Sequence, residues 1–232
     1  ACTKYLEEKM EERVVKASMS LGGIPAAIVE MHEKGLVRTV ACSQSFDAVA
    51  AKAIVDYPGI IEIDNSLYAN PARKGCMLNR ETFGILAALE VDIDFNVNIL
   101  TGSNGEMMGG LGGGPDVAAG AQISIVVLPI VRGRIPSVVK KVFTCCTPGD
   151  TVAVVITEAG IALNPNHKNY QELKEDLEKT SLKLVTIEKL RQTAEGLTGT
   201  PKPIECTDKI TCIVEYRDGT VLDVIREIKK QD

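Results

Sequence analysis

The chain has 232 residues, of which 45% are apolar, and its formal net charge is −5 at pH 7. That apolar content is ample for a hydrophobic core and predicts a soluble globular protein. The negative charge and the lack of a basic cluster argue against nucleic-acid binding, because that binding requires Lys and Arg to neutralise phosphates. No apolar run reaches about 18 residues, and the N-terminus is a charged amphipathic segment, so we also expect no membrane role.

Seven cysteines are scattered along the chain without C-x-x-C spacing, and the two histidines are His32 and His167. This pattern predicts reduced thiols in a cytoplasmic protein. A zinc site or a Cys–His nucleophile needs histidine partners close to the cysteines. We therefore expect neither of them, and no bound metal.

The first third of the chain alternates between helix and strand patterns. We expect helices over residues 3–13, 25–35 and 47–57, and strands over residues 15–21, 36–42 and 60–63. The first strand should end at Gly22-Gly23, and residues 64–75 should form a polar turn region. Such alternation with short connections is typical of a parallel, doubly wound sheet with right-handed crossovers.

Apolar runs predict further strands in the rest of the chain, over residues 83–91, 96–100, 123–130, 138–146, 151–157 and 160–163. The strands after Pro136 should extend the sheet in an antiparallel sense. Residues 168–191 contain two charged amphipathic helices. Residues 210–216 and 220–228 predict a hairpin, since Asp218-Gly219 fits a type I′ turn. We expect that hairpin to pair with an edge of the sheet or with a partner.

A glycine segment, residues 102–120, holds eight of the chain's twenty glycines. It includes Gly112, Gly113 and Gly114 directly before Pro115, which is a favoured first residue of a helix. Glycines before a helix N-terminus collect amide donors that suit a phosphate, a carboxylate or a developing oxyanion, and Gly113 is a candidate for a positive φ angle. The pattern is not a P-loop, since the first lysine after Gly102 is Lys140. The alternative is that these glycines serve turns and bulges only.

Polar or glycine-containing loops are expected beyond the carboxyl ends of the strands, where open parallel sheets bind ligands. These loops should converge with the glycine segment. Asp92 and Asp94 are equally well explained as turn caps. The remaining candidate binding residues are Gly22, Gly23, Gln44, Ser45, Asn70, Asn96, Asn98 and Asp116.

Several ordered segments of the chain resemble the citrate lyase alpha chain, the citrate CoA-transferase component. They are KASMSLGGIPAAIVEMHEKGL, QSFDAVA, YANPARKGCMLNR, ALEVDIDFNVNILTGSNG, AAGAQISIVVLPIVRGRIPSVV, GIALNPN and EYRDGTVLDV. The resemblance covers nearly the whole sequence, which is similar to the second half of a family chain about twice as long. A start at Ala1, inside a predicted helix, agrees with a fragment of a longer protein.

The resemblance implies a CoA-transferase-like α/β fold, with a mostly parallel sheet flanked by helices and a C-terminal β-hairpin. Residues 1–232 would then be a single domain, the second half of a two-domain chain, with residues 166–232 as a helical and hairpin extension. The implied partners are the beta (lyase) and gamma (acyl carrier) subunits, citrate and an acetyl thioester, and we expect a homo-oligomer. No cofactor would be bound by the chain itself.

The resemblance also implies a reaction. Citrate carboxylate attacks an acetyl thioester on the carrier, whose thiol belongs to a phosphoribosyl-dephospho-CoA group, and forms a mixed anhydride; the freed thiolate then takes the citryl group. The amides of Gly112, Gly113 and Gly114 would stabilise the oxyanion, and Arg132 or Arg134 would bind the tricarboxylate.

Two positions depart from related patterns. Related transferases with a covalent glutamate carry it in a Glu-Asn-Gly loop, whereas the comparable loop here is Leu21-Gly22-Gly23-Ile24, so we expect direct transfer without an acyl-enzyme. Gly114 stands where the family often has histidine, which predicts a weaker or differently tuned loop. Two other functions stay open from the residues: an α/β domain that binds a nucleotide or sugar phosphate, and a non-catalytic half that docks other subunits.

Overall fold

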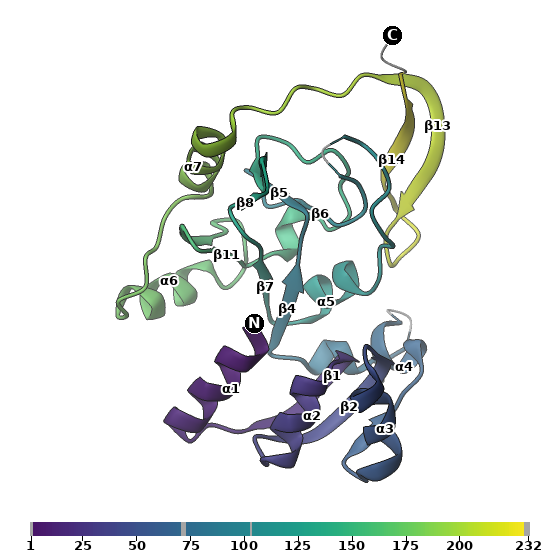
Figure 1. The fold of residues 1–232 in the computed structure, drawn as a ribbon, viewed down its shortest axis with the longest axis vertical. Coiled ribbons are helices and arrows are strands. Elements are labelled where there is room, and N and C mark those ends of the chain that lie inside the picture. The colour runs from purple at the N-terminus through teal and green to yellow at the C-terminus, as the bar shows by residue number, and fades with distance from the viewer. Residues whose placement is uncertain (1, 71–72, 103, 230–232) are drawn as a thin grey trace. The chain divides into compact units, whose positions relative to one another are not determined.

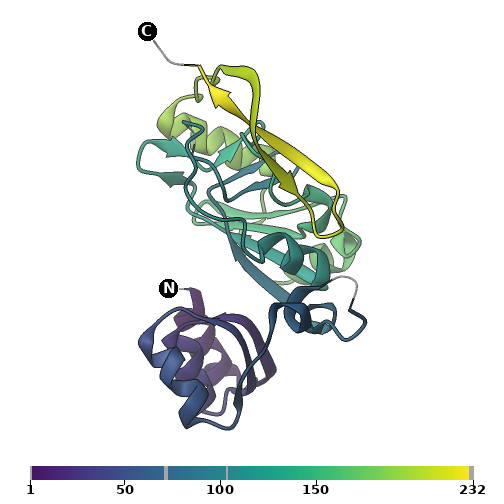
Figure 2. The ribbon, with the colours of Figure 1, turned by 90° about the vertical axis from the view of Figure 1, so that its right-hand side faces the viewer.

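The computed structural model describes residues 2–70, 73–102 and 104–229. The chain divides into two compact units, unit 1 (Ala1–Leu78) and unit 2 (Asn79–Asp232). Figure 1 and Figure 2 show the elements of each unit. The expectation of a single domain over residues 1–232 with an extension from residue 166 stays a prediction, and each unit is described by itself.

Unit 1 is built on a three-stranded parallel sheet in the order β1-β2-β3. Its strands are β1 (Ala17–Ile24), β2 (Val37–Ser45) and β3 (Ile60–Glu62), and its helices are α1 (Cys2–Arg13), α2 (Ala26–Glu33), α3 (Ala48–Asp56) and α4 (Asn65–Ala69). The short 3₁₀ helix η1 (Met77–Arg80) follows. The three helices and three strands predicted for this region are confirmed.

The core of unit 1 forms where apolar residues of α2 and α3 meet the sheet, with Val29, Val40, Ala53 and Ile60 all buried. Helix α3 begins at Asp47, whose carboxylate accepts hydrogen bonds from the backbone N–H of Ala50 at 2.8 Å and of Ala26 at 2.7 Å. One side chain therefore caps α3 and fixes the start of α2.

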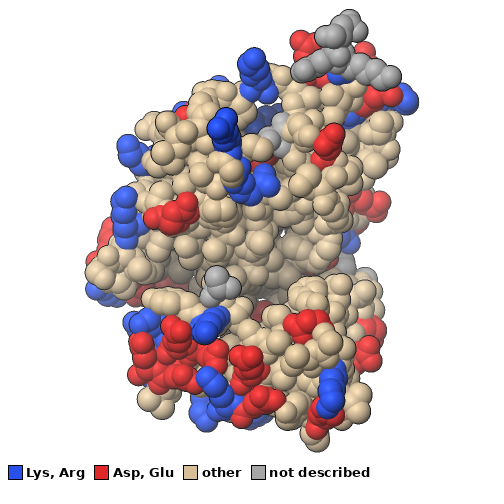
Figure 3. Space-filling view, viewed as in Figure 1, with Lys and Arg blue, Asp and Glu red and all other residues tan. Residues whose placement is uncertain are grey.

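Acidic side chains gather over helix α1 (Figure 3). Glu7 of this helix is buried, and its carboxylate lies 2.6 Å from the ammonium group of Lys34. The same ammonium group lies 3.0 Å from Glu11, so one lysine ties the end of α2 to two carboxylates of α1.

Two expectations for unit 1 are wrong. Strand β1 does not end at Gly22-Gly23 but continues to Ile24, because both glycines remain paired with β2 across a register shift. The expected polar turn from residue 64 contains helix α4 instead, because the Asp64 carboxylate accepts the backbone N–H of Leu67 at 2.7 Å and caps it. Residues 71–72 of that turn lie outside the described residues.

Unit 2 contains a four-stranded mixed sheet in the order β12-β11-β7-β4 and a three-stranded sheet in the order β10-β5-β6. The strands of the first are β4 (Phe83–Ala87), β7 (Ile123–Val127), β11 (Val154–Thr157) and β12 (Gly160–Leu163); those of the second are β5 (Glu90–Asp92), β6 (Val97–Asn98) and β10 (Val138–Val139). Strands β4, β7 and β11 are parallel, and β12 is antiparallel to β11. Of the strands expected to extend the sheet in an antiparallel sense after Pro136, only β12 does so, because β10 pairs parallel with β5 and β11 pairs parallel with β7. Strands β8 (Val131–Arg132) and β9 (Ile135–Pro136) form a small antiparallel pair.

Helices and a hairpin complete unit 2. The helices are α5 (Gly114–Gly120), α6 (Tyr170–Glu178) and α7 (Ile187–Thr198), with the 3₁₀ turn η2 (Gly149–Thr151). Strands β13 (Cys206–Glu215) and β14 (Val221–Ile228) form the predicted hairpin. The hairpin is a sheet of its own and, within the described residues, pairs with no other strand. Gly219 has φ +89 but Asp218 has no positive φ, so the turn is not type I′.

The main core of unit 2 lies between the sheets and helix α7. Val126, Val138, Val155, Leu190 and Ala194 belong to one buried cluster. Helix α5 packs on β4 at Gly84, where an added Cβ would lie 2.5 Å from Val117. The predicted α/β class is thus confirmed, but the sheets are mixed and do not form one mostly parallel sheet.

For two strands of unit 2, the prediction from apolar runs was wrong. Residues 83–91 form two strands in different sheets, with a break after Ala87. Of the strand expected over residues 138–146, only Val138–Val139 is regular. Beyond it, backbone N–H groups bond to distant side chains, as when the Asp92 carboxylate accepts from Val142 at 3.3 Å.

Gly149 sits where the irregular chain meets the loop between β5 and β6. Its N–H donates to Asn96 Oδ1 at 3.0 Å, and its carbonyl accepts from Asn164 Nδ2 at 2.7 Å. An added Cβ would lie 1.9 Å from the backbone oxygen of Asp94. This position has no room for a side chain.

We expect Gly149→Ala to lower the free energy of unfolding of the protein by at least about 2–3 kcal/mol, because backbone must shift to admit the methyl group. Chemical denaturation of the variant beside the parent protein measures this. Gly196→Ala is the matched control, since no atom lies within 4 Å of its added Cβ and it sits in helix α7. That control should be neutral or stabilising by up to about 1 kcal/mol; equal stabilities of the two variants would contradict the packing argument.

Candidate functional site

In unit 1, four predicted site residues lie together at the carboxyl ends of two neighbouring parallel strands. Gly23 is paired with Gln44, and the next pair along is Ile24 with Ser45. Gly22, with φ +115, lies at the register shift that separates these pairs from the rest of the ladder. The backbone turns there in a way that other residues adopt only with strain.

Aromatic side chains cover these glycines. An added Cβ at Gly23 would lie 2.1 Å from the Phe46 ring, and one at Gly22 would lie 3.4 Å from the Tyr68 hydroxyl oxygen. Tyr68 comes from helix α4, whose C-cap residue is Asn70. The amide of Asn70 donates to Ser66 Oγ at 3.2 Å. The loops predicted to converge in unit 1 therefore do meet, and Phe46 and Tyr68 lie in two of these predicted loops.

In unit 2, a buried network of hydrogen bonds around Asn98 fixes the start of the glycine segment. Asn98 is completely buried, and its side-chain amide donates to Glu90 Oε2 at 3.0 Å and to the Thr101 carbonyl at 2.9 Å. Its Oδ1 accepts the backbone N–H groups of Leu100 and Thr101, each at 3.1 Å. Asn98 thus holds the chain in place and, in this arrangement, has no surface to offer a ligand.

The first part of the glycine segment closes on itself. Gly102 donates to the Glu106 carbonyl at 2.8 Å, and Met108 donates to the Leu100 carbonyl at 2.6 Å. Residue 103 lies outside the described residues. Gly109 and Gly110 follow, and an added Cβ at either would meet no atom within 4 Å. This part of the segment is open to solvent.

Gly112, Gly113 and Gly114 lead from Leu111 into helix α5. Gly112 has φ +58, whereas Gly113, the N-cap, has φ −88, so the expectation of a positive φ at Gly113 is wrong. The Gly113 carbonyl accepts the N–H of Val117 at 2.9 Å and begins the helix. Among the described residues, no oxygen accepts a hydrogen bond from the backbone N–H of these three glycines. These three amides are therefore without a protein acceptor among the described residues.

Asp116 of helix α5 pairs with Arg217, which lies in the turn of the C-terminal hairpin. Arg217 Nε lies 3.4 Å from Asp116 Oδ1, and Arg217 Nη1 donates to the Asp116 carbonyl at 3.5 Å. Burial raises the pKa of the Asp116 carboxyl, and the guanidinium opposes that rise. The carboxylate that the sequence assigned to ligand binding is thus already engaged by the protein.

Asn96 belongs to a second buried network. Asp92 accepts the backbone N–H of Asn96 at 2.9 Å and its side-chain amide at 3.2 Å, so the capping explanation of Asp92 is confirmed. Burial raises the pKa of Asp92 against these hydrogen bonds. Burial, with the nearby Asp223 carboxylate, raises the pKa of the Cys145 thiol to about 12. Cys145 is therefore a protonated thiol at neutral pH.

Arg132 and Arg134 lie in the β8–β9 hairpin. Arg132 Nε donates to the Leu89 carbonyl at 3.1 Å, while Arg134 is exposed in the turn. Neither arginine forms a hydrogen bond or ion pair with a described residue of the glycine segment. Arg217 does form such a contact with the glycine segment, but the sequence did not predict it, because its Arg-Asp-Gly sequence signals only a turn.

Two features are absent from the described part of the chain. It holds no group of three or more His, Cys, Asp and Glu side chains that is arranged to bind a metal ion. None of its helices combines the length and apolar character that crossing a membrane requires.

Known proteins resemble this chain along its full length. The family of the citrate lyase alpha subunit (CitF) matches residues 1–228. The citrate lyase alpha chain of Klebsiella pneumoniae is 49% identical over 232 residues, which make up 100% of this chain and 45% of that protein. The chain thus spans less than half the length of this curated relative.

Solved structures agree with the sequence match. A structure described as the alpha subunit of citrate lyase from Streptococcus mutans in complex with citrate has a TM-score of 0.94 at 43% identity, over 98% of this chain and 44% of that chain. RipA from Yersinia pestis shares the fold alone, with a TM-score of 0.53 at 14% identity over 78% of this chain and 48% of that one. Because the family match reaches almost every residue, the chain belongs to the citrate lyase alpha subunit family.

Proposed function

We propose that the whole protein is the citrate CoA-transferase component of citrate lyase, with a CoA-transferase-like fold, and that this chain supplies part of its transfer site. The reaction exchanges acetyl for citryl on the thiol of an acyl carrier subunit through a mixed anhydride. Family membership and the citrate named with the Streptococcus mutans structure support the substrate. The beta and gamma subunits as partners, a homo-oligomeric state, and a cytoplasmic location, consistent with seven free cysteines, belong to the same proposal.

The observation that carries the proposal is the set of unpaired amides at Gly112, Gly113 and Gly114. When citrate attacks the acetyl thioester, the carbonyl oxygen gains negative charge. Backbone N–H groups that already point at an acceptor stabilise that charge without having to reorganise. The carrier's CoA-like group would supply a thiol as acyl acceptor, and the glycine segment fits it because Gly109 and Gly110 leave open space beside the donors.

Unit 1 holds its own group of proposed binding residues, which are Gly22, Gly23, Gln44, Ser45 and Asn70. The strand ends hold two glycines and an uncharged amide and hydroxyl, which suit the polar parts of a thioester carrier. No glutamate follows Gly22-Gly23, which supports direct transfer. Of the cations, Arg132 and Arg134 remain proposed citrate ligands.

The proposal is tested by transfer with the whole protein. The purified full-length chain is incubated with acetylated carrier subunit and isotopically labelled citrate, and label on the carrier is measured. We expect the carrier to become labelled and acetate to be released in equal amount. A full-length protein that binds the carrier and citrate but transfers no label would overturn the proposed activity.

We expect Gly112→Val to reduce the transfer rate of the full-length protein by about 100-fold or more, since the loss of one oxyanion donor typically costs about 2.7–4 kcal/mol. A β-branched residue strains a backbone with φ +58 and moves the neighbouring amides. Gly196→Ala is the control, because it lies in helix α7 outside the glycine segment, its added Cβ meets no atom within 4 Å and its φ is not positive. That control should stay within about twofold of the parent rate. Near-normal transfer by Gly112→Val would remove the segment from the reaction.

We expect Cys145 not to act as an acyl acceptor and to resist alkylation. With a pKa of about 12, only about one Cys145 thiol in ten thousand is a thiolate at pH 8. Iodoacetamide at pH 8 should therefore label the exposed Cys212 well before Cys145, as peptide mass spectrometry would report. Labelling in denaturant is the control, and there the two cysteines should react with iodoacetamide at equal rates. Rapid labelling of Cys145 in the folded protein would contradict the raised pKa.

A further inference from the structure

The C-terminal hairpin contacts the glycine segment at several points along its length. At the open end of the hairpin, the Ile228 side chain packs so closely on Gly105 that an added Cβ there would lie 2.8 Å away. In the middle, Leu111 packs against a buried cluster that contains Val214 and Ile225. At the turn, Arg217 reaches Asp116. The hairpin therefore follows the segment from Gly105 to the start of helix α5.

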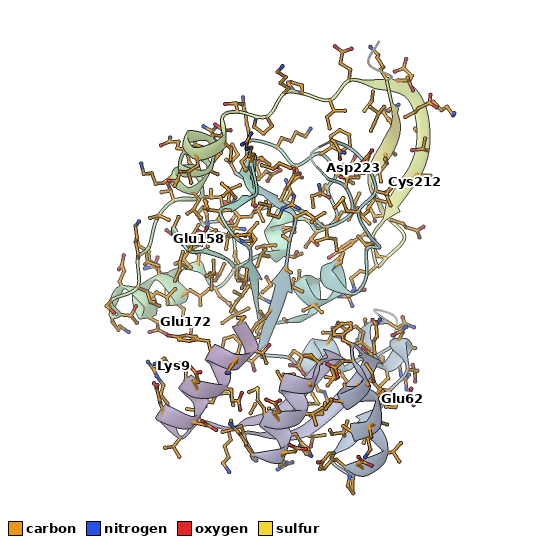
Figure 4. The ribbon with its side chains drawn as sticks, viewed as in Figure 1. Lys9, Glu62, Glu158, Glu172, Cys212 and Asp223 are labelled. Carbon is orange, nitrogen blue, oxygen red and sulfur yellow. The ribbon has the colours of Figure 1, made fainter. Side chains whose placement is uncertain are left out.

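The hairpin is itself attached to the body of unit 2. Asp223 of β14, labelled in Figure 4, accepts the backbone N–H of Cys145 at 2.8 Å. Val214 and Ile225 are buried with Leu100 and Cys146. Because a two-stranded hairpin alone is only marginally stable, these contacts are what give it a fixed position. A hairpin held in this way is a rigid support for whatever its turn touches.

Arg217 contacts the glycine segment at the start of helix α5. Its side chain is 11% exposed and that of Asp116 is 25% exposed, so the pair is largely shielded from water. Arg217 engages both the carboxylate and the carbonyl of Asp116, the third residue of helix α5. Two contacts to one residue restrain the direction of the helix start as well as its place.

We propose that the C-terminal hairpin holds the glycine segment in its binding shape, with Arg217 as the positioning residue that fixes the start of helix α5. This inference rests on the proposed function for its catalytic meaning. Arg217 is assigned no contact with a reacting atom. It acts through Asp116, because the amides of Gly112, Gly113 and Gly114 are joined to Asp116 through Pro115 alone and move with it.

The test uses the full-length protein and three variants. Arg217→Met removes the charge and both contacts, Arg217→Lys restores the charge with one donor group, and Asp116→Asn keeps the side-chain shape without its charge. Lys209→Met is the matched control, since Lys209 forms an exposed ion pair of 2.9 Å with Glu227 on the same hairpin. The two readouts are hydrogen exchange of the α5 amides from Val117 to Ala121, and kcat and KM for citrate in transfer.

We expect Arg217→Met to raise exchange of the α5 amides about tenfold, since a charged hydrogen-bonded contact has been lost from the start of the helix. Exchange of the β13 amides should stay unchanged. Transfer should show a kcat lowered about 10- to 100-fold with KM within about threefold, as expected when orientation rather than binding is lost. Arg217→Lys should recover part of both effects, and Lys209→Met should resemble the parent.

Unchanged α5 exchange in Arg217→Met would overturn the inference, whatever the kinetics. Raised exchange with unchanged kcat would uphold the positioning of the segment by the hairpin and would count against the proposed function of the segment. If Arg217→Met does not fold, Asp116→Asn gives the same two measurements. Its α5 exchange must rise at least about threefold for the inference to stand.

Discussion

Unit 2 depends on buried side chains that replace the backbone hydrogen bonds its short strands cannot supply. Buried N–H and C=O groups must be paired, and the irregular chain between β10 and β11 meets a strand only through an isolated bridge between Thr147 and Val97 of β6 among the described residues. Asn96, Asn164 and Asp92 take that role, with Asn164 Nδ2 donating to the carbonyls of Gly149 at 2.7 Å and Val152 at 2.8 Å. The 3₁₀ turn η2 is thereby tied to two separate parts of the sheet. Removal of one amide would leave several buried groups unpaired at once.

The same principle explains how a glycine-rich segment keeps a defined shape. Its flexible residues lie between two fixed points. The hydrogen-bond network around Asn98 and Thr101 holds the chain where the segment begins, with Thr101 Oγ1 2.9 Å from Thr144 Oγ1. The start of helix α5 is held by the contact between Asp116 and Arg217. Glycine loses more conformational entropy on folding than other residues, so such a stretch needs support from outside itself. The C-terminal hairpin provides that support along the side of the segment.

Local patterns predicted the helices, the hairpin and the parallel strands of unit 1, because caps and periodicity act within a few residues. They failed where distant residues decide the backbone. The apolar run over 138–146 matches a strand, yet its N–H groups bond to carboxylates 50 and 78 positions away. For the candidate site, the rule that loops at the carboxyl ends of parallel strands lie together correctly placed Gly22 near Gln44. Asn98 was assigned to binding because of its polar type, although burial gives it a structural task, and Arg217 lies 101 positions from its partner.

The charge of Asp116 bears on what the amides before it can bind. A free carboxylate at the start of α5 would repel an anionic oxygen at the neighbouring N–H groups, and it would offer those donors an internal acceptor. Arg217 removes both effects, because the guanidinium compensates the negative charge and holds Oδ1 on its own side. Since burial makes an uncompensated carboxylate costly, the pair also stabilises the packed position of the helix. The hairpin turn therefore compensates the charge at the start of helix α5 through a partner 101 positions away, and in the proposed site this compensation would leave the glycine amides as neutral donors.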